Sequence, residues 1–389
     1  MHRGNWFSWG WKAVALAFIG LLAVGANVAQ KDAKFSSNQW RLADPIRYEN
    51  MSVFPVVSRQ LADTASFATL DEGLSAGEVV ISEGGAEMIR RSRDGQPVAI
   101  PQQRGASVNQ LVLINRGSKP LLLLAGELVS GGKQDRIISK DRIVPPGAAP
   151  LPLDVFCVEA GRWTGGAQFA AGKLIVHPSV REQAAITKEQ DKVWAAVRGG
   201  TAAAPPPAVG SASGTARMSG QTTQSVTVTE STLADAITTT APTQSYAKLY
   251  KSPQVGVPAD TFADEVQRRF ERATAKLKGE SVVGVVVAYG GEVAWSDIFA
   301  SPTLFERYWP KLLRSYVVEA LVRPKSSEQP SVDDAREFLK PLAGHESIET
   351  EPAIYSLRQV TQGKYVEMEL EALRPVEITL HVLKLHRAS

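Results

Sequence analysis

The stretch LLLLAGELVSGGKQDRIISKDRIVPPG (residues 121–147) carries a strong strand signal and, directly after it, the densest polar chemistry of the chain. Four consecutive leucines predict a strand. The near-repeat of KQDRI and KDRIV then brings a lysine, an aspartate and an arginine together twice, seven residues apart. Charged side chains that directly follow so apolar a strand must be paired with one another, exposed, or functional.

The functional interpretation of this stretch is a pocket for a small anion. Arg136 or Arg142 would hold a phosphate or a carboxylate in a forked geometry, and Lys133 would add positive charge. Glu127 or Asp135 would handle a proton or a hydroxyl group, which makes these two the candidate catalytic residues. The full set of candidate ligand-binding residues is Glu127, Lys133, Gln134, Asp135, Arg136, Asp141 and Arg142.

The competing interpretation of the same stretch is structural. Strand periodicity places Lys133 and Asp135 on one face, whereas Gln134 and Arg136 lie on the other. Mixed charges of this kind commonly pair with one another on exposed hairpins and need no ligand. The residue types by themselves leave both interpretations open.

The sequence around this stretch predicts mainly strands. EVVISE (78–83) and LVLIN (111–115) are expected to be strands, and the turn after the second predicts a tight antiparallel pair with residues 120–129. A short helix over residues 70–76 is expected to end at the glycine that follows it. A longer helix is predicted for residues 178–198, with apolar side chains on one side and two glycines at its end.

The later part of the chain mixes helices and hairpins. A capping-box pattern at Thr261 predicts a helix that runs to about residue 278. VVGVVVAYGGEVAWSDIF (282–299) predicts a β-hairpin around its two adjacent glycines. Another helix is expected to begin at Pro302 and to be broken into two pieces by Pro310. Alternating apolar residues near the C-terminus predict further strands.

Length and composition bound the class of protein. The chain has 389 residues, of which 44% are apolar and 21% charged, as expected of a globular protein with a substantial core. A single cysteine excludes a disulfide scaffold and a zinc site built from paired cysteines, and Cys157 is expected to be a buried thiol. The net charge of +3 does not indicate a nucleic-acid partner. No metal or cofactor motif is present, so neither group is expected.

The N-terminal residues 1–29 have the pattern of a secretory signal peptide. A cationic start is followed by the apolar run AVALAFIGLLAV (13–24) and by small residues suited to cleavage. The protein is therefore expected to be exported, to the periplasm or the extracellular space. The alternative is an uncleaved segment that anchors the protein to the membrane, although the run is short for a membrane span.

The organisation of the chain indicates an α+β fold. Residues 30–47 form an extension, 48–198 an antiparallel β-rich first half with a closing helix, and 246–389 a second half of helices and hairpins packed with the first. Between the halves, residues 199–245 are rich in Ala, Pro, Ser and Thr, and such a composition predicts a disordered insert.

One hydrolase motif also occurs in the first half. Residues 73–77, GLSAG, match the G-x-S-x-G pattern of nucleophile elbows. That motif requires a strand before the serine and a helix after it, whereas a helix is expected here before the serine and a strand after it. The match is therefore interpreted as coincidental.

The sequence resembles a known family at the polar stretch and at two other places. The run of residues 121–147, LDVFCVEAGRW (153–163) and IFASPTLFERYWPKLLRSYVVEAL (298–321) are similar to the ARG and rhodanese-phosphatase-superfamily-associated protein domain, where ARG means ADP-ribosylglycohydrolase. The resemblance extends over about residues 48–385, with the insert as an addition. Association with such partners implies a nucleotide-like or phosphorylated ligand.

Three functions remain open at this point. The first is an exported protein that binds a small phosphorylated or carboxylated ligand at the GELVSGGKQDR segment (126–136). The second is a hydrolase acting on a nucleotide-like or glycosidic substrate with Glu127 or Asp135 as acid/base. The third is a structural or protein-interaction module of the envelope. The sequence assigns no oligomeric state.

Overall fold

The computed structural model describes residues 40–83, 90–91, 97–98, 109–160, 165–199, 244–249, 252–323, 326 and 328–387. The expected signal segment (1–29) lies outside these residues. So does the expected insert, apart from Gly199 and residues 244–245. No helix among the described residues has the length and apolar character needed to cross a membrane.

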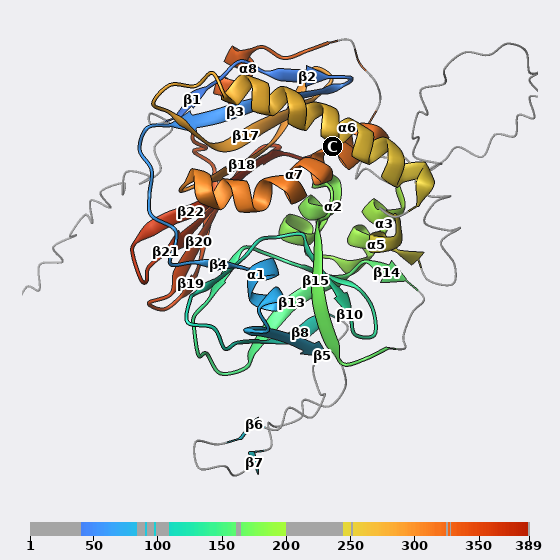
Figure 1. Ribbon diagram of the computed structural model, residues 1–389, viewed down its shortest axis with the longest axis vertical. Coiled ribbons are helices and arrows are strands. Elements are labelled where there is room, and N and C mark those ends of the chain that lie inside the picture. The colour runs from blue at the N-terminus through green and yellow to red at the C-terminus, as the bar shows by residue number, and fades with distance from the viewer. Residues whose placement is uncertain are drawn as a thin grey trace, which may run out of the picture. The chain divides into compact units, whose positions relative to one another are not determined.

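The largest element is an antiparallel sheet of nine strands (Figure 1). The strand order is β1-β3-β17-β18-β22-β21-β20-β19, and β2 pairs with β3. Its strands are β1 (Trp40–Leu42), β2 (Ile46–Tyr48), β3 (Met51–Ser58), β17 (Ser281–Tyr289), β18 (Glu292–Phe299), β19 (His345–Glu351), β20 (Tyr355–Gln362), β21 (Tyr365–Ala372) and β22 (Ile378–His386). Because β3 pairs with β17, the two halves of the chain share this sheet.

The second element is a closed antiparallel barrel with the strand order β10-β11-β13-β8-β5-β15. Its strands are β5 (Val79–Glu83), β8 (Gln110–Asn115), β10 (Glu127–Gly131), β11 (Arg136–Ile138), β13 (Leu151–Cys157) and β15 (Gln168–Ile175). Alternate residues of these strands fill the interior with leucine, valine and isoleucine side chains. The opposite faces of β10, β11 and β13 join the main core, which extends to the nine-stranded sheet.

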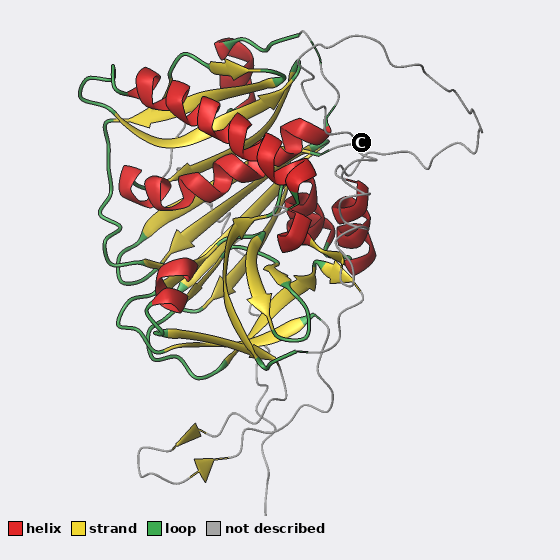
Figure 2. Cartoon of the chain, turned by 45° about the vertical axis from the view of Figure 1, so that its right-hand side comes forward, coloured by secondary structure: helices red, strands yellow, loops and turns green. Residues whose placement is uncertain are grey.

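Short strands and helices complete the fold (Figures 1 and 2). There are three small sheets among the described residues. In the first, β9 (Leu121–Leu123) pairs with β12 (Arg142–Val144) and β4 (Ala68–Thr69). The other two pair β14 (Glu159–Ala160) with β16 (Gln244–Ser245) and β6 (Arg90–Arg91) with β7 (Pro97–Val98). The helices are α1 (Leu70–Ser75), α2 (Pro178–Glu182), the π-helical turn η2 (Gln183–Thr187), α3 (Gln190–Gly199), α5 (Tyr246–Leu249), α6 (Pro253–Thr274), α7 (Pro302–Val322) and α8 (Val332–Phe338). Helix α7 packs against α6, β17 and the barrel strand β15, whereas α8 covers the opposite face of the sheet.

The α+β class with large antiparallel sheets is confirmed, and so are several local predictions. Helix α1 ends as expected before Gly77, whose φ of +71° suits a glycine. Strands β17 and β18 form the predicted hairpin. The order of a helix before Ser75 and a strand after it is also as expected for the GLSAG segment.

The predicted antiparallel pairing of residues 111–115 with residues 120–129 is wrong. Strand β8 pairs instead with β5 and β13, whereas the leucine strand β9 leaves the barrel and pairs with β12 and β4. The amide of Asn115 donates to the carbonyls of Lys119 (2.9 Å) and Val144 (3.1 Å) and so directs the chain away from a hairpin. Gly126, at φ +85°, then separates β9 from β10.

Three helix predictions also need correction. The helix expected over residues 178–198 is interrupted after η2 by Lys188, which has a φ of +57°. Helix α6 begins at Pro253, well before Thr261. Pro310 does not break α7, because large side chains on both sides of it, including those of Tyr308 and Leu312, are buried against the sheet and barrel. Tertiary burial outweighs the cost of a proline in a helix interior.

Replacing Pro310 by alanine is therefore expected to stabilise the protein. The exposed Pro310 carries an intrinsic penalty of about 3 kcal/mol relative to alanine, and we expect Pro310→Ala to raise the free energy of unfolding by about 1 to 3 kcal/mol. Urea unfolding followed by circular dichroism measures this change. Pro302→Ala is the matched control, because a proline at the first helical position carries no such penalty. Equal effects of the two substitutions would contradict this account of α7.

Candidate functional site

The seven candidate residues of the polar stretch lie in three different environments. Glu127 and Asp141 contact the helices and the large sheet, and Arg142 lies on the outside near β20. The other four, Lys133 to Arg136, lie at the far end of the β10–β11 hairpin. The structure therefore does not bring the seven side chains into one cluster.

Glu127 forms a buried ion pair with a lysine of α7. Its Oε1 atom lies 2.6 Å from Lys311 Nζ, and its Oε2 atom accepts the backbone N–H of Leu124 at 2.8 Å. Lys311 also contacts Asp71 of α1 at 2.8 Å. Burial raises the pKa of Glu127, although the charge of Lys311 opposes this shift. The carboxylate thus links the barrel to α7.

Asp141 belongs to a fully buried chain of charges. Asp141 Oδ1 accepts the N–H of Ala125 at 2.8 Å, and Oδ2 lies 2.5 Å from His381 Nδ1. The other ring nitrogen, His381 Nε2, lies 3.0 Å from Asp297 Oδ1. Asp297 in turn accepts hydrogen bonds from both terminal nitrogens of Arg181, at 2.9 and 3.0 Å.

Two further side chains donate hydrogen bonds to Asp297. Trp295 Nε1 donates to Asp297 Oδ2 at 2.8 Å, and the hydroxyl of Tyr316 donates to the same oxygen. Burial would raise the pKa of Asp297, but Arg181 and His381 hold it well below its usual range. Asp297 is therefore ionised at neutral pH.

His381 is charged in this environment. Burial alone would lower its pKa, but the carboxylates of Asp141 and Asp297 outweigh burial and raise the pKa to about 9. Both ring nitrogens then donate to carboxylates, so neither is available to accept a proton from a substrate. Despite the likeness of an Asp–His pair to part of a catalytic triad, this cluster is structural.

Sequence reasoning missed Lys311, Arg181, Asp297 and His381. Their signal was a charged or titratable residue inside an apolar run, such as Asp297 in VAWSDIF. The residues that these side chains contact, however, lie more than eighty positions away in the sequence; His381 and Asp297, for example, are 84 positions apart. No spacing rule connects residues so distant.

The third environment, at the far end of the β10–β11 hairpin, includes the end of the barrel interior, where Arg136 lies. Its side chain is completely buried. It is paired across the strands with Val129 and Cys157, and the neighbouring positions Ile138 and Val155 fill the barrel. Alternation along the strands therefore directs the Arg136 side chain into the same interior.

Among the described residues, only one nitrogen of this guanidinium group has hydrogen-bond partners. Arg136 Nη1 donates to the carbonyl of Gln134 at 2.8 Å, with longer contacts to other Gln134 and Asp135 oxygens. Within the part of the chain that the structure describes, the buried Nε and Nη2 atoms have no partner. These two nitrogens form one edge of the guanidinium plane, with their N–H bonds parallel.

Glu83 and Cys157 lie close to this arginine. Glu83 is buried at the end of β5, where its Oε1 atom accepts the N–H of Lys133 at 2.7 Å. Burial raises the pKa of the Cys157 thiol to about 11, while the charge of Arg136 lowers it and that of Glu83 raises it further. The thiol is therefore neutral, and Cys157 is the buried cysteine expected from the sequence.

The turn beside Arg136 is closely packed. A Cβ atom at Gly132, which has a φ of +51°, would lie 2.1 Å from Phe169 Cζ. Asp135 is buried and accepts the N–H of Gly131 (3.1 Å) and the hydroxyl of Ser245 (2.9 Å). One Asp135 oxygen therefore supports the turn, and the other bonds the turn to β16.

Arg142 shows the surface pairing that the competing interpretation anticipated. Its Nη1 atom donates to the carbonyl of Pro152 at 2.8 Å, and Nη2 lies 4.0 Å from Glu351. Lys140 pairs with Glu349 on the same strand β19 at 2.5 Å. No group of three or more His, Cys, Asp and Glu side chains among the described residues is arranged to hold a metal ion.

These features define an α+β protein in which an antiparallel barrel is joined to a nine-stranded sheet and has a buried, incompletely bonded arginine at one end of its interior. The chain belongs to the family of the ARG and Rhodanese-Phosphatase-superfamily-associated Protein domain, whose model matches residues 39–381. The resemblance seen in the sequence is thereby confirmed. Comparisons with curated proteins and with solved structures gave no match.

The charged state of His381 predicts a loss of stability at alkaline pH. Folding raises the pKa of His381 from 6.5 to about 9. The contribution of His381 to the free energy of unfolding is therefore complete below about pH 6.5 and is lost as the pH rises through 9. A shift of this size corresponds to about 3 kcal/mol. Urea unfolding between pH 6 and 10 should show this decrease in the wild type and a flatter profile in His381→Gln.

The matched control for this measurement is His345→Gln, because His345 is exposed on β19. This variant should keep the wild-type pH profile. Parallel profiles for the wild type and His381→Gln would contradict the charged state assigned to His381.

Proposed function

We propose that this chain is a ligand-binding protein whose Arg136 holds the carboxylate or phosphate group of a small molecule. One observation carries the proposal: the guanidinium is completely buried, yet Nε and Nη2 have no hydrogen-bond partner within the described structure. Burying a charged group with unmade hydrogen bonds costs several kcal/mol. Most buried polar groups are satisfied, and an exception calls for a functional or solvent partner.

The free edge of Arg136 suits an oxyanion. Two parallel N–H bonds match two oxygens of a carboxylate or phosphate, which gives a bidentate and therefore oriented contact. The bond from Nη1 to the Gln134 carbonyl fixes the guanidinium plane before any ligand arrives. The apolar barrel interior beneath it would strengthen the ion pair by excluding water.

The proposal also includes the class of the ligand and the compartment in which the protein would bind it. A nucleotide-like or phosphorylated ligand follows from the family's named association with ADP-ribosylglycohydrolase and phosphatase proteins. The signal-peptide pattern of residues 1–29 supports export, and a protein exported this way would meet its ligand outside the cytoplasm.

The hydrolase alternative rests on one observation, the raised pKa of Glu127, which is a feature of general acids. The same carboxylate is bonded to Lys311 and to the Leu124 N–H, and Asp135 uses both its oxygens within the protein. Binding at Arg136 is therefore the better supported function.

Replacing Arg136 by methionine tests the proposal. Removing a buried cation that lacks full compensation should leave the free energy of unfolding of the free protein unchanged or raise it. The same variant should lose stabilisation by ribose 5-phosphate, AMP or malonate. A probe that binds the wild type, present at a concentration one hundred times its Kd, would add about 2.7 kcal/mol to the free energy of unfolding. Thermal unfolding with and without each probe gives both quantities.

Two variants serve as controls for this test. Arg142→Met removes a half-buried arginine outside the barrel and should keep the response to the probes. Arg181→Met leaves Asp297 without its main partner and should cost about 3 to 5 kcal/mol. If Arg136→Met destabilises the free protein as strongly as Arg181→Met does, Arg136 is a structural residue and the proposal is wrong.

A further inference from the structure

A buried carboxylate shares the end of the barrel interior with Arg136. Glu83 is only 5% exposed, and it follows Val79 and Ile81 on the face of β5 that fills the barrel. A Cβ atom at Gly132 would lie 2.7 Å from Glu83 Oε1, so the carboxylate lies beside the β10–β11 turn. Strand alternation therefore directs Glu83 into the same interior that Arg136 enters.

Glu83 and Arg136 are near each other but do not pair. Both charges act on the Cys157 thiol, because Arg136 lowers its pKa whereas Glu83 raises it. Among the described residues, however, neither Glu83 nor Arg136 forms an ion pair. The hydrogen bond that Glu83 accepts comes from the backbone N–H of Lys133. Two opposite charges are thus buried at one end of the barrel, too far apart to neutralise each other directly.

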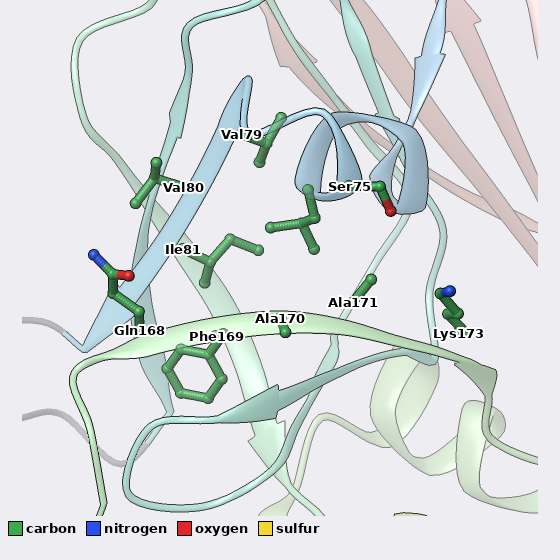
Figure 3. Close-up of a pocket in the computed structure, with 11 residues that line it drawn as sticks. Ser75, Val79, Val80, Ile81, Gln168, Phe169, Ala170, Ala171 and Lys173 are labelled. Carbon is green, nitrogen blue, oxygen red and sulfur yellow. The ribbon is translucent and has the colours of Figure 1, made fainter.

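The surroundings of these two charges are apolar. The ring of Phe169 lies on the side of β15 that faces away from α1, as Figure 3 shows, and belongs to the apolar cluster of the barrel. Leu111, the cross-strand neighbour of Glu83, belongs to the same cluster. So does Val129, which is paired with Arg136. In such surroundings an uncompensated charge is costly, and a matched pair of charges gains more than it would in water.

A site with two separate and opposite charges favours a ligand that carries both. An oxyanion alone would compensate Arg136 but would place a further negative charge near Glu83. A ligand with an ammonium group beside its oxyanion compensates both side chains at once through charge-assisted hydrogen bonds. Such a ligand can also span two groups that are too far apart to pair with each other.

We propose that this end of the barrel binds a small zwitterion, with its oxyanion at Arg136 and its ammonium group at Glu83. This inference rests on the ligand-binding function proposed for Arg136 and narrows it to ligands that carry a cation. Glu83 Oε1 keeps its bond to the Lys133 N–H, and Oε2 receives the ammonium group. The oxyanion is a carboxylate, as in an amino acid, or a phosphate, as in a phosphorylated amine.

Two matched pairs of probes test this inference on the full chain. L-Alanine and O-phosphoethanolamine carry the ammonium group, whereas propionate and ethyl phosphate differ from them by lacking it. We expect at least one zwitterion to bind about tenfold more tightly than its matched anion, since a hydrogen bond to a charged group contributes free energy of this order. Calorimetric titration at neutral pH measures the affinities, and a preference between the two zwitterions identifies the oxyanion.

Replacing Glu83 by glutamine separates the charge from the fold. Glu83→Gln keeps an oxygen for the Lys133 N–H but loses the negative charge. It should bind a zwitterion no more tightly than the matched anion, and it should bind the anion at least as tightly as the wild type does. A merely structural effect would weaken both probes alike. Glu78→Gln is the matched control, because Glu78 is exposed just before β5, and it should keep the wild-type affinities.

The outcomes that contradict this inference are distinct from those that contradict the function proposed for Arg136. Equal affinity of the wild type for each zwitterion and its matched anion would overturn the inference, and so would wild-type affinity for the zwitterions in Glu83→Gln. Absence of binding by both zwitterions would overturn it alone if ribose 5-phosphate, AMP or malonate still stabilises the wild type but not Arg136→Met. If none of these compounds binds, both proposals are wrong.

Discussion

The structure depends on one fully buried carboxylate, that of Asp297. It lies on β18 in the middle of the large sheet and receives hydrogen bonds from Arg181 of α2 and from His381 of β22, which continues to Asp141 beside the barrel. A carboxylate removed from water is stable only when cations and donors surround it. Because these partners come from the sheet, a helix and the segment between two barrel strands, one set of charges ties the barrel to the sheet.

This arrangement divides the polar stretch between two roles. Glu127 and Asp141 are each neutralised by a cation from the second half of the chain, and their oxygens also accept backbone N–H groups. Arg136, in the same stretch, has two buried nitrogens without a hydrogen-bond partner among the described residues. The difference is physical: the oxygens of Glu127 and Asp141 are bonded within the fold, whereas the two buried nitrogens of Arg136 are the observation on which the proposal of a ligand rests.

Local signals in the sequence predicted local structure well and pairing poorly. The Gly77 end of α1 and the β17–β18 hairpin follow from residues that are neighbours in the chain, and both are confirmed. The pairing of the leucine strand was wrong, because Asn115 redirects the chain through a bond to a carbonyl twenty-nine residues away. Pro310 likewise failed to break α7, because burial of its neighbours outweighs a local penalty. Export and the ligand at Arg136 stay predictions.

The sequence by itself determined the α+β class, the family, and the stretch in which polar chemistry is concentrated. These properties depend on composition, on periodicity and on a contiguous motif, which a single chain displays directly. Only the tertiary structure decided which charges of that stretch are neutralised, because their partners, such as Lys311 and His381, come from distant strands and helices. The energy of a buried charge depends on what surrounds it in space, and sequence order does not contain that information.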